Sequence, residues 1–492
     1  MSKPVKVLAL AMGDGINLVL NFILVPILAR LFDIETYGTY GQVLMVAGFW
    51  LSFLSMGLNT ILLRDLAQTD NKVGVFGNNL MSGFLLGTMG TITLWVAAPY
   101  LQIHFNNAGL AENLRWYSLF IPFTIAIGSC NAALIFLGKS RKIVGISVFI
   151  NAARLVGIIA LVTIFGHSLK MIFGYLTLLS VLQFLLLMRN IDWHFSMDQI
   201  SKVGVQKQIT EAWPLGLTII ISSMFTVADG FFVSSMLDVH EYAIYRNGAM
   251  YLPLIMNLFA AINSIILPDV SRMFISGDWV KILELKKNIA NIFVYVVYPV
   301  LLYFIFFGRD LVSLIYSEKY VASALVFQIY NISLLFRFCN SEDLFLAANK
   351  TRILPVIYAC VCLYAFLANY LLIGSLGMQG AAVAALSGTL ALMFMVYYFG
   401  FKIINYSLFQ IIPFKAIGRV LLLTAPLILF CSFGTALWDE TWIFLFLFAP
   451  YIFFCYVFML RSQWLDPVMV RNLLASVFGS GKLIRIYDIV VR

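Results

Sequence analysis

Four charged residues stand deep inside long apolar runs of this sequence: Asp14, Arg154, Asp229 and Arg337. An ionisable group near the centre of a bilayer costs roughly 3 kcal/mol on insertion scales, so it normally faces a charged partner or a water-filled cavity. A buried aspartate can carry a proton. Arginine can bind phosphate oxygens through two parallel hydrogen bonds and keeps its charge at any physiological pH. The four residues therefore point to ion coupling and to anion binding.

Each charge has polar companions at helical spacing, which places charge and companions on one helix face. The four expected stripes are Asp14, Asn17 and Asn21; Ser147, Asn151 and Arg154; Ser222, Thr226 and Asp229; and Ser333, Arg337, Asn340 and Ser341. The residues that we expect to bind substrate are Asn17, Asn21, Arg64, Asn151, Arg154 and Arg337. For ion coupling we expect Asp14 and Asp229, with a proton or a sodium ion as the coupled species.

A structural interpretation of the same charges stays open. Asp14 with Arg154, and Asp229 with Arg337, would form two ion pairs. Such pairs would hold helices together without touching any substrate, because a buried charge needs a partner whether or not a ligand is present.

The composition requires that these stripes lie on membrane helices. The chain has 492 residues, of which 62% are hydrophobic and only 11% are charged, against roughly 25% charged in soluble domains. Apolar runs of about 20 residues, the length that crosses a bilayer as a helix, recur along the whole chain. We therefore predict an all-α integral membrane protein with about 14 transmembrane helices. These include span 1 at 7–30, span 8 at 247–267, span 9 at 289–308 and span 10 at 322–347.

The basic residues suggest an orientation. The net charge of +9 is concentrated in connections such as "GKSRK" (138–142) and in the segment after Arg461. Cytoplasmic loops carry the excess of Lys and Arg, so we expect both termini in the cytoplasm, and no nucleic-acid partner is needed to explain the charge. Arg64 lies at the expected cytoplasmic mouth, where it would anchor a span or draw in an anionic head group.

The sequence also contains an internal duplication. "LFDIETYGTYG" (31–41) is repeated as "MLDVHEYAIYRNG" (236–248), "NTILLRDLA" (59–67) as "NSIILPDVS" (263–271), and "GKSR" (138–141) as "NKTR" (349–352). Six predicted spans separate the copies, and an even number makes the two halves parallel. Parallel repeats are typical of transporters with a substrate path between them.

The duplication divides the chain into segments. The predicted segments are an N-terminal six-helix lobe at 1–188, a cytoplasmic linker at 189–211, a C-terminal six-helix lobe at 212–401, two additional transmembrane helices at 402–460 and a basic cytoplasmic tail at 461–492.

Three stretches carry a family resemblance: "LFDIETYGTYG" (31–41), "VADGFFVSSMLDVHEYAIY" (227–245) and "LGMQGAAVAALSG" (376–388). With the architecture they resemble the Wzx-type polysaccharide transporters, the O-antigen flippases of the multidrug/oligosaccharidyl-lipid/polysaccharide exporter superfamily. The resemblance implies a flippase in the bacterial inner membrane. Its substrate would be an undecaprenyl-pyrophosphate-linked oligosaccharide for O-antigen, capsule or exopolysaccharide assembly. Membrane lipids, a polysaccharide polymerase and chain-length proteins would be its partners.

Two other transporters of the superfamily stay open as alternatives. A lipid II flippase would be expected to carry arginines deep in spans 1 and 8, yet span 8 has none between Arg246 and Arg272. A multidrug or cation extruder would favour buried acids without deep basic groups, and Arg154 and Arg337 weigh against it.

Enzymatic activity is not expected. All four histidines fall in or beside connections, whereas a membrane acyltransferase would need a buried histidine as its base. The six cysteines show no metal-ligand spacing, so neither a metal nor a cofactor is expected. "GSGK" (479–482) lacks the first glycine and the final Ser or Thr of a phosphate-binding loop.

Overall fold

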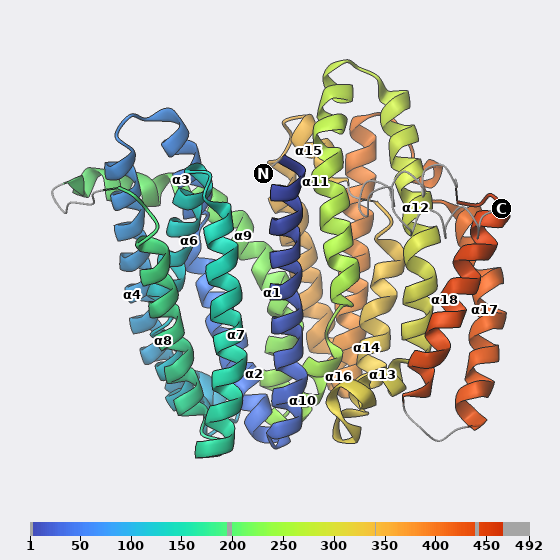
Figure 1. The fold of residues 1–492 in the computed structure, drawn as a ribbon, viewed down its shortest axis with the longest axis horizontal. Coiled ribbons are helices and arrows are strands. Elements are labelled where there is room, and N and C mark those ends of the chain that lie inside the picture. The colour runs from blue at the N-terminus through green and yellow to red at the C-terminus, as the bar shows by residue number, and fades with distance from the viewer. Residues whose placement is uncertain (1–2, 194–198, 340, 438–441, 466–492) are drawn as a thin grey trace. The chain divides into compact units, whose positions relative to one another are not determined.

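The computed structural model describes residues 3–193, 199–339, 341–437 and 442–465. The side chains of residues 3–14 lie outside the description, and the predicted site residue Asp14 is among them. Every regular element in the described ranges is a helix, as the sequence predicts (Figure 1). By their contacts the helices form two compact units: unit 1 comprises residues 1–246 with 358–381, and unit 2 comprises 247–357 with 382–492.

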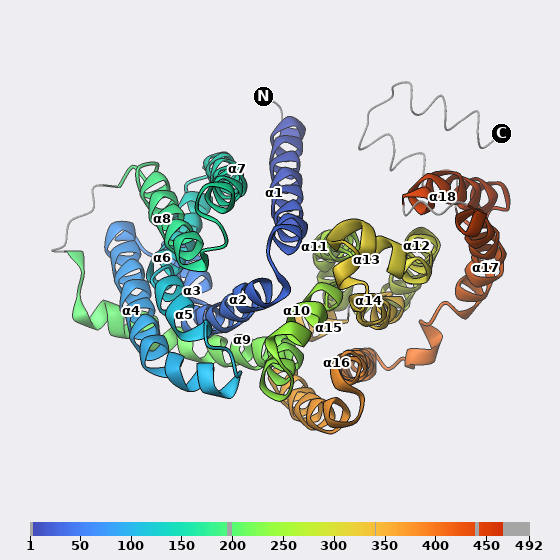
Figure 2. The same cartoon turned by 90° about the horizontal axis from the view of Figure 1, so that it is seen from below.

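Unit 1 contains the helices of the first half of the chain (Figure 2). They are α1 (Lys3–Leu31), α2 (Ile34–Ser55), α3 (Leu58–Gln68), α4 (Lys72–His104), α5 (Leu110–Ser118), α6 (Ile121–Phe136), α7 (Ser140–Phe165), α8 (Leu169–Met188), α9 (Lys202–Met236) and most of α10 (Val239–Gly248). The central part of α16 (Ile353–Ile403) also belongs to it. The last ten residues of the predicted linker 189–211 are thus the beginning of α9.

Unit 2 contains the remaining helices. They are α11 (Pro253–Ile275), α12 (Trp279–Phe306), α13 (Gly308–Tyr316), α14 (Ser323–Ile332), α15 (Glu342–Ala347), both ends of α16, α17 (Phe414–Leu437) and α18 (Ile443–Arg461), with short 3-10 turns η2 (Glu318–Tyr320), η3 (Ser333–Phe336) and η4 (Leu408–Gln410). The predicted lobe boundaries at 1–188 and 212–401 stay a prediction.

The helices have the length and the surface of membrane spans. Ten stretches among the described residues are long and apolar enough to cross a bilayer, and Gly15–Leu31 and Ser323–Phe336 are shorter apolar helices. The 51-residue α16 is broken at Gly377, whose φ of 59° is open to glycine at little cost. One face of α4 exposes Met89, Ile92 and Val96, as lipid contact requires. The integral membrane fold is confirmed, and the number fourteen stays a prediction.

Equivalent positions of the two sequence repeats make the same hydrogen bonds. Asp33 caps α2 by accepting from the Thr36 amide at 2.8 Å, and Asp238 caps α10 by accepting from the Glu241 amide at 2.7 Å. In the "GKSR" and "NKTR" turns the amides of Lys139 and Lys350 each donate at 2.8 Å to a carbonyl five residues earlier. The duplication seen in the sequence is therefore also present in local structure.

The predicted span 322–347 is not one continuous helix. It consists of α14, η3 and α15, and the helix is interrupted between Phe336 and Glu342. A broken helix at membrane depth is tolerated only where its freed backbone groups find partners. The Tyr397 hydroxyl supplies them by donating to the carbonyls of Phe336, at 3.1 Å, and Cys339, at 2.8 Å. The Tyr298 hydroxyl donates to the Leu335 carbonyl.

Candidate functional site

Polar stripes on α1 and α7 meet inside unit 1. Asn151 donates its side-chain amide to Asn17 Oδ1 at 2.9 Å, and Asn21 Nδ2 donates to the Asn17 carbonyl at 2.8 Å. Arg154 Nη1 donates to Asn21 Oδ1 at 3.4 Å. Four of the predicted site residues therefore form one continuous polar seam, which we call the α1–α7 seam.

Among the described residues, no acidic side chain neutralises the charge of Arg154. Asn21 is neutral, and the buried Nε atom of Arg154 has no hydrogen-bond partner among the described residues. An unpaired guanidinium donor in an apolar environment is costly unless a ligand or water supplies an acceptor. The predicted pair of Arg154 with Asp14 is not tested, because the Asp14 side chain lies outside the described residues.

Asp229 on α9 is buried and held by two donors. Its Oδ2 atom accepts from the Tyr245 hydroxyl at 2.7 Å, and its Oδ1 atom accepts from the Gly230 amide at 2.7 Å. Tyr245 belongs to the second copy of the duplicated motif. A carboxylate held in this way keeps a fixed orientation within the span, which any ion-coupling role would require.

Arg337 lies in unit 2 at the interruption between η3 and α15. Its Nη1 atom lies 3.4 Å from the Met256 sulfur, and its guanidinium carbon lies 5.5 Å from the centre of the Phe259 ring. Among the described residues of unit 2, Arg337 makes no ion pair. A cation over an aromatic face is stabilised by roughly 0.5–2 kcal/mol and retains its positive charge for a further partner.

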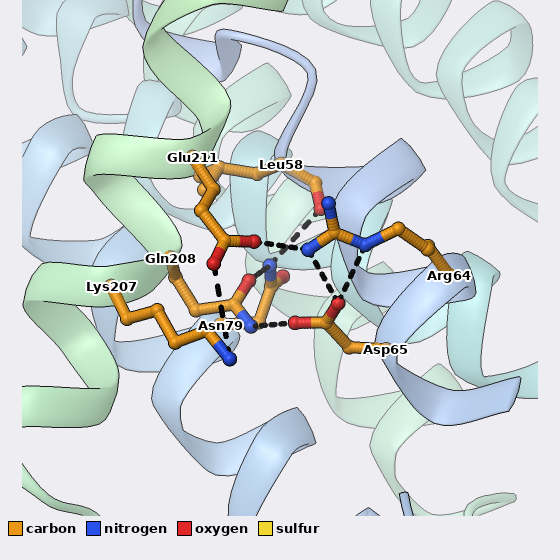
Figure 3. Close-up of polar contacts among 7 residues, drawn as sticks. All are labelled: Leu58, Arg64, Asp65, Asn79, Lys207, Gln208 and Glu211. Atoms are coloured by element: carbon orange, nitrogen blue, oxygen red, sulfur yellow. Dashed lines mark hydrogen bonds and ion pairs between the residues drawn. The ribbon is translucent and has the colours of Figure 1, made fainter. Parts of the chain in front are cut away.

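Arg64 is already engaged, in contrast to the two deep arginines. Figure 3 shows its guanidinium between Asp65, at 2.6 Å, and Glu211 of α9. The hydrogen bond from Arg64 lowers the pKa of Glu211 below its ordinary value of 4.5. A second cation, Lys207, lies 3.8 Å from Glu211.

Uncharged groups extend this network into the bundle (Figure 3). Gln208 donates to Asp65 at 2.9 Å and accepts from Asn79 at 2.9 Å. Asn79 also donates to the Leu58 carbonyl at 3.0 Å, and Ser129 donates to Asn79 at 2.8 Å. The network ties the first turns of α9 to α3, α4 and α6, so Arg64 acts as a structural bridge in this conformation.

The duplicated motifs pack against each other within unit 1. A Cβ atom on Gly38 of α2 would lie 2.4 Å from the Val239 carbonyl oxygen of α10. The guanidinium of Arg246 lies 5.5 Å from the ring centre of Tyr37 and 5.7 Å from that of Tyr40. We call this close approach the α2–α10 contact.

Sequence comparison then decides the family. The family model described as "Polysaccharide biosynthesis protein" matches residues 5–274, more than half of the 492-residue chain. The chain belongs to the polysaccharide biosynthesis protein family. No curated protein matches it significantly.

Solved structures of similar fold are membrane transporters. The lipid II flippase MurJ in an inward closed conformation aligns with a TM-score of 0.72 and 15% identity, over 92% of this chain and 99% of that one. An inward-facing multidrug resistance MATE family transporter aligns with a TM-score of 0.65 and 14% identity, over 82% of this chain and 98% of that one. A MOP superfamily transporter from Pyrococcus furiosus aligns with a TM-score of 0.55 and 12% identity, over 82% of this chain and 98% of that one. At these identities the likeness establishes the fold.

This member of the polysaccharide biosynthesis protein family therefore shares its fold with membrane transporters and flippases. The family resemblance noted in the sequence is confirmed, and the fold resembles those of flippases and exporters.

Sequence reasoning missed two polar features of this family member. Lys286 of α12 and Asp343 of α15 form an ion pair whose side chains are only 2% and 6% exposed. Asp343 lies within the predicted span 322–347, and Lys286 lies just before the predicted span 289–308. Nothing in the local sequence indicates that the two side chains meet. The second feature is a hydroxyl-lined cavity between α2 and α9. Its members Ser222 and Thr226 belong to a predicted stripe, whereas Ser52 had no such signal.

Proposed function

We propose that this protein is a flippase that moves an undecaprenyl-pyrophosphate-linked oligosaccharide from the inner to the outer leaflet by alternating access. The product would serve O-antigen, capsule or exopolysaccharide assembly. The observation that carries the proposal is the α1–α7 seam, where Arg154 contacts only neutral partners among the described residues. An arginine in this state attracts a pyrophosphate, and the neighbouring asparagines suit sugar hydroxyls.

The proposal assigns roles to the other deep residues. Arg337 would provide a second anion-binding group, because it carries no ion pair within the described part of unit 2. Asp229 would couple transport to a proton or sodium gradient through its bond with Tyr245. Arg64 would contribute to substrate binding only after its bridge to Glu211 opens.

The cellular setting belongs to the same proposal. The protein would lie in the bacterial inner membrane with both termini in the cytoplasm, since basic connections such as residues 138–142 are expected there. A polysaccharide polymerase and chain-length proteins would take up the transported glycan on the far side.

The test is complementation of a deletion strain, with lipid-linked glycan assayed on each leaflet. We expect Arg154→Gln to reduce outer-leaflet glycan by at least tenfold, because roughly 1.5–3 kcal/mol of charged hydrogen bonding is lost. Arg154→Lys, which retains the charge but not the fork geometry, should restore part of the activity. The matched control is Arg115→Gln, on the exposed face of α5. Normal export by stably inserted Arg154→Gln would contradict the proposal.

Two alternatives rest on the fold comparisons. A multidrug or cation extruder is favoured by the likeness to a MATE transporter and by the buried Asp229. A lipid II flippase is favoured by the likeness to MurJ. Normal surface glycan with new drug sensitivity in the deletion strain would select the extruder. Loss of lipid II from the outer leaflet in the deletion strain would select the lipid II flippase.

A further inference from the structure

Two cavities adjoin along the antiparallel helices α2 and α9 of unit 1. The first has a volume of about 280 Å³ and contains Gly48, Ser52, Ser222, Ser223 and Thr226 in its lining. The helices touch on either side of this cavity. A Cβ atom on Gly230 would lie 2.9 Å from the Met45 sulfur, and one on Gly216 would lie 3.0 Å from the Met56 Cβ atom, whereas a Cβ atom on Gly48 would meet nothing within 4 Å. The hollow is therefore bounded at both ends.

The hydroxyls of the first cavity are set as acceptors. Ser52 donates its hydroxyl hydrogen to the Gly48 carbonyl at 3.0 Å, Ser222 donates to the Ile219 carbonyl at 2.9 Å, and Thr226 donates to the Ser222 carbonyl at 2.9 Å. Each hydroxyl oxygen keeps lone pairs for another donor. Because none of the described residues that line this cavity is ionised, the cavity suits a neutral ligand rich in hydroxyl donors, such as a sugar.

The second cavity has a volume of about 260 Å³ and is entirely apolar. Its aromatic walls are Phe49, Trp50, Phe231, Phe232 and Phe366. The Trp50 indole already donates to Thr93 Oγ1 at 2.9 Å, so it offers the cavity only an apolar surface. Pockets that enclose a whole small ligand run to about 300–1,000 Å³. A space of this size suits one segment of a hydrocarbon chain.

The two cavities share Met45, Phe49 and Val227. A ligand with a hydroxyl-bearing half and a hydrocarbon half can therefore occupy both at once, with this shared wall at the junction. Neither half alone matches the lining of both cavities, because hydroxyl groups stand beside apolar groups in the first cavity, whereas the second cavity is apolar throughout.

We propose that this cavity pair is a binding subsite for a polyprenyl-linked saccharide, with the prenyl chain against the aromatic cavity and a sugar residue against the hydroxyl-lined cavity. The inference rests on the proposed flippase function and adds a site on α2 and α9 that is separate from the α1–α7 seam. It assigns recognition of the lipid part of the substrate to Trp50, Phe232 and Phe366.

The experiment is photo-crosslinking of the full-length protein in nanodiscs. The first probe is undecaprenyl pyrophosphate with a diazirine on its prenyl chain, and the second is the same lipid carrying one hexose. Crosslinked peptides are identified by mass spectrometry. We expect labelling within residues 45–50, 224–232 and around 366.

Two filling variants separate the cavities. Met224→Trp, which fills the apolar cavity, should reduce this labelling several-fold for both probes. Gly48→Leu, which fills the hydroxyl-lined cavity, should remove only the additional labelling that the hexose confers. Gly145→Leu on α7 is the control, because a Cβ atom there also meets nothing within 4 Å.

The outcomes distinguish the two proposals. Labelling of the wild type at other helices, or labelling of Met224→Trp equal to the wild type, would overturn the subsite and leave the flippase function standing. Absence of any prenyl labelling in the wild type would overturn both.

Discussion

Replacing Gly38 by alanine tests the α2–α10 contact. We expect Gly38→Ala to weaken this contact, whereas the same replacement at Gly145, where the added Cβ atom meets nothing, should stabilise its helix. A Cβ atom at Gly38 would lie 2.4 Å from the Val239 carbonyl oxygen, 2.8 Å from Val239 Cγ2 and 3.2 Å from Ala243 Cβ. The first of these neighbours is backbone, which cannot turn aside as a flexible side chain can. Gly38→Ala must therefore separate α2 from α10 or distort one of them.

The size of the effect follows from general values. Overpacking a tight contact costs about 1–3 kcal/mol, and a bias of that size changes an equilibrium by roughly 5–150-fold. Replacing an unobstructed helical glycine by alanine has the opposite sign and stabilises a helix by about 1 kcal/mol. Gly145→Ala on α7 is the matched control, because no atom lies within 4 Å of its added Cβ.

Hydrogen–deuterium exchange of the protein in nanodiscs measures the contact directly. We expect Gly38→Ala to accelerate exchange in the peptides that contain residues 34–41 and 239–246, and to leave other helices unchanged. Gly145→Ala should slow exchange in α7 or leave it unaltered. If Gly38→Ala protects both peptides as well as the wild type does, α2 and α10 do not pack as closely as the structure shows.

Two further predictions concern the ion pairs. The pKa of Glu211 is lowered by the hydrogen bond from Arg64, so the stability that this carboxylate contributes is present above pH 4.5 and is lost as pH falls through the lowered value. Glu211→Gln should flatten this part of a melting-temperature profile in detergent, whereas the control Lys202→Gln, at the exposed start of α9, should leave it unchanged. An unchanged profile for Glu211→Gln would contradict the bridge. Lys286→Met should destabilise the protein by about 3–5 kcal/mol, because it leaves the buried Asp343 unpaired. The double variant with Asp343→Leu should recover most of that loss in chemical denaturation, and failure to recover would mean that the cost is not electrostatic.

The motif "LFDIETYGTYG" shows what can and what cannot be predicted from a local sequence pattern. Its recurrence at residues 236–248 revealed the duplication, and both aspartates cap helices in the structure. Glycine at position 38 had no evident reason in the sequence, since its counterpart in the repeat is Ala243. The reason is tertiary: Gly38 allows the two copies to approach, with Ala243 as one of the neighbours.

For the deep charges, too, the spacing of residues predicts which side chains share a helix face but not which helices meet. Helical spacing placed Asn17 and Asn21 on one face and Asn151 and Arg154 on another, and the structure joins these faces. Spacing could not show that Arg64 reaches Glu211, 147 positions away. Nor could it reveal the interruption beside Arg337, because the tyrosine that satisfies the freed carbonyls comes from α16.

An all-helical membrane protein with an internal duplication and polar stripes can be inferred from the amino-acid sequence alone. Those properties depend on composition and on the periodicity of one helix at a time, which bilayer thickness and backbone hydrogen bonding constrain strongly. The folded structure is needed to show which stripes face each other, which charges are neutralised and where cavities lie between α2 and α9. These depend on contacts between segments far apart in the chain, for which the spacing of residues along a single helix carries no information.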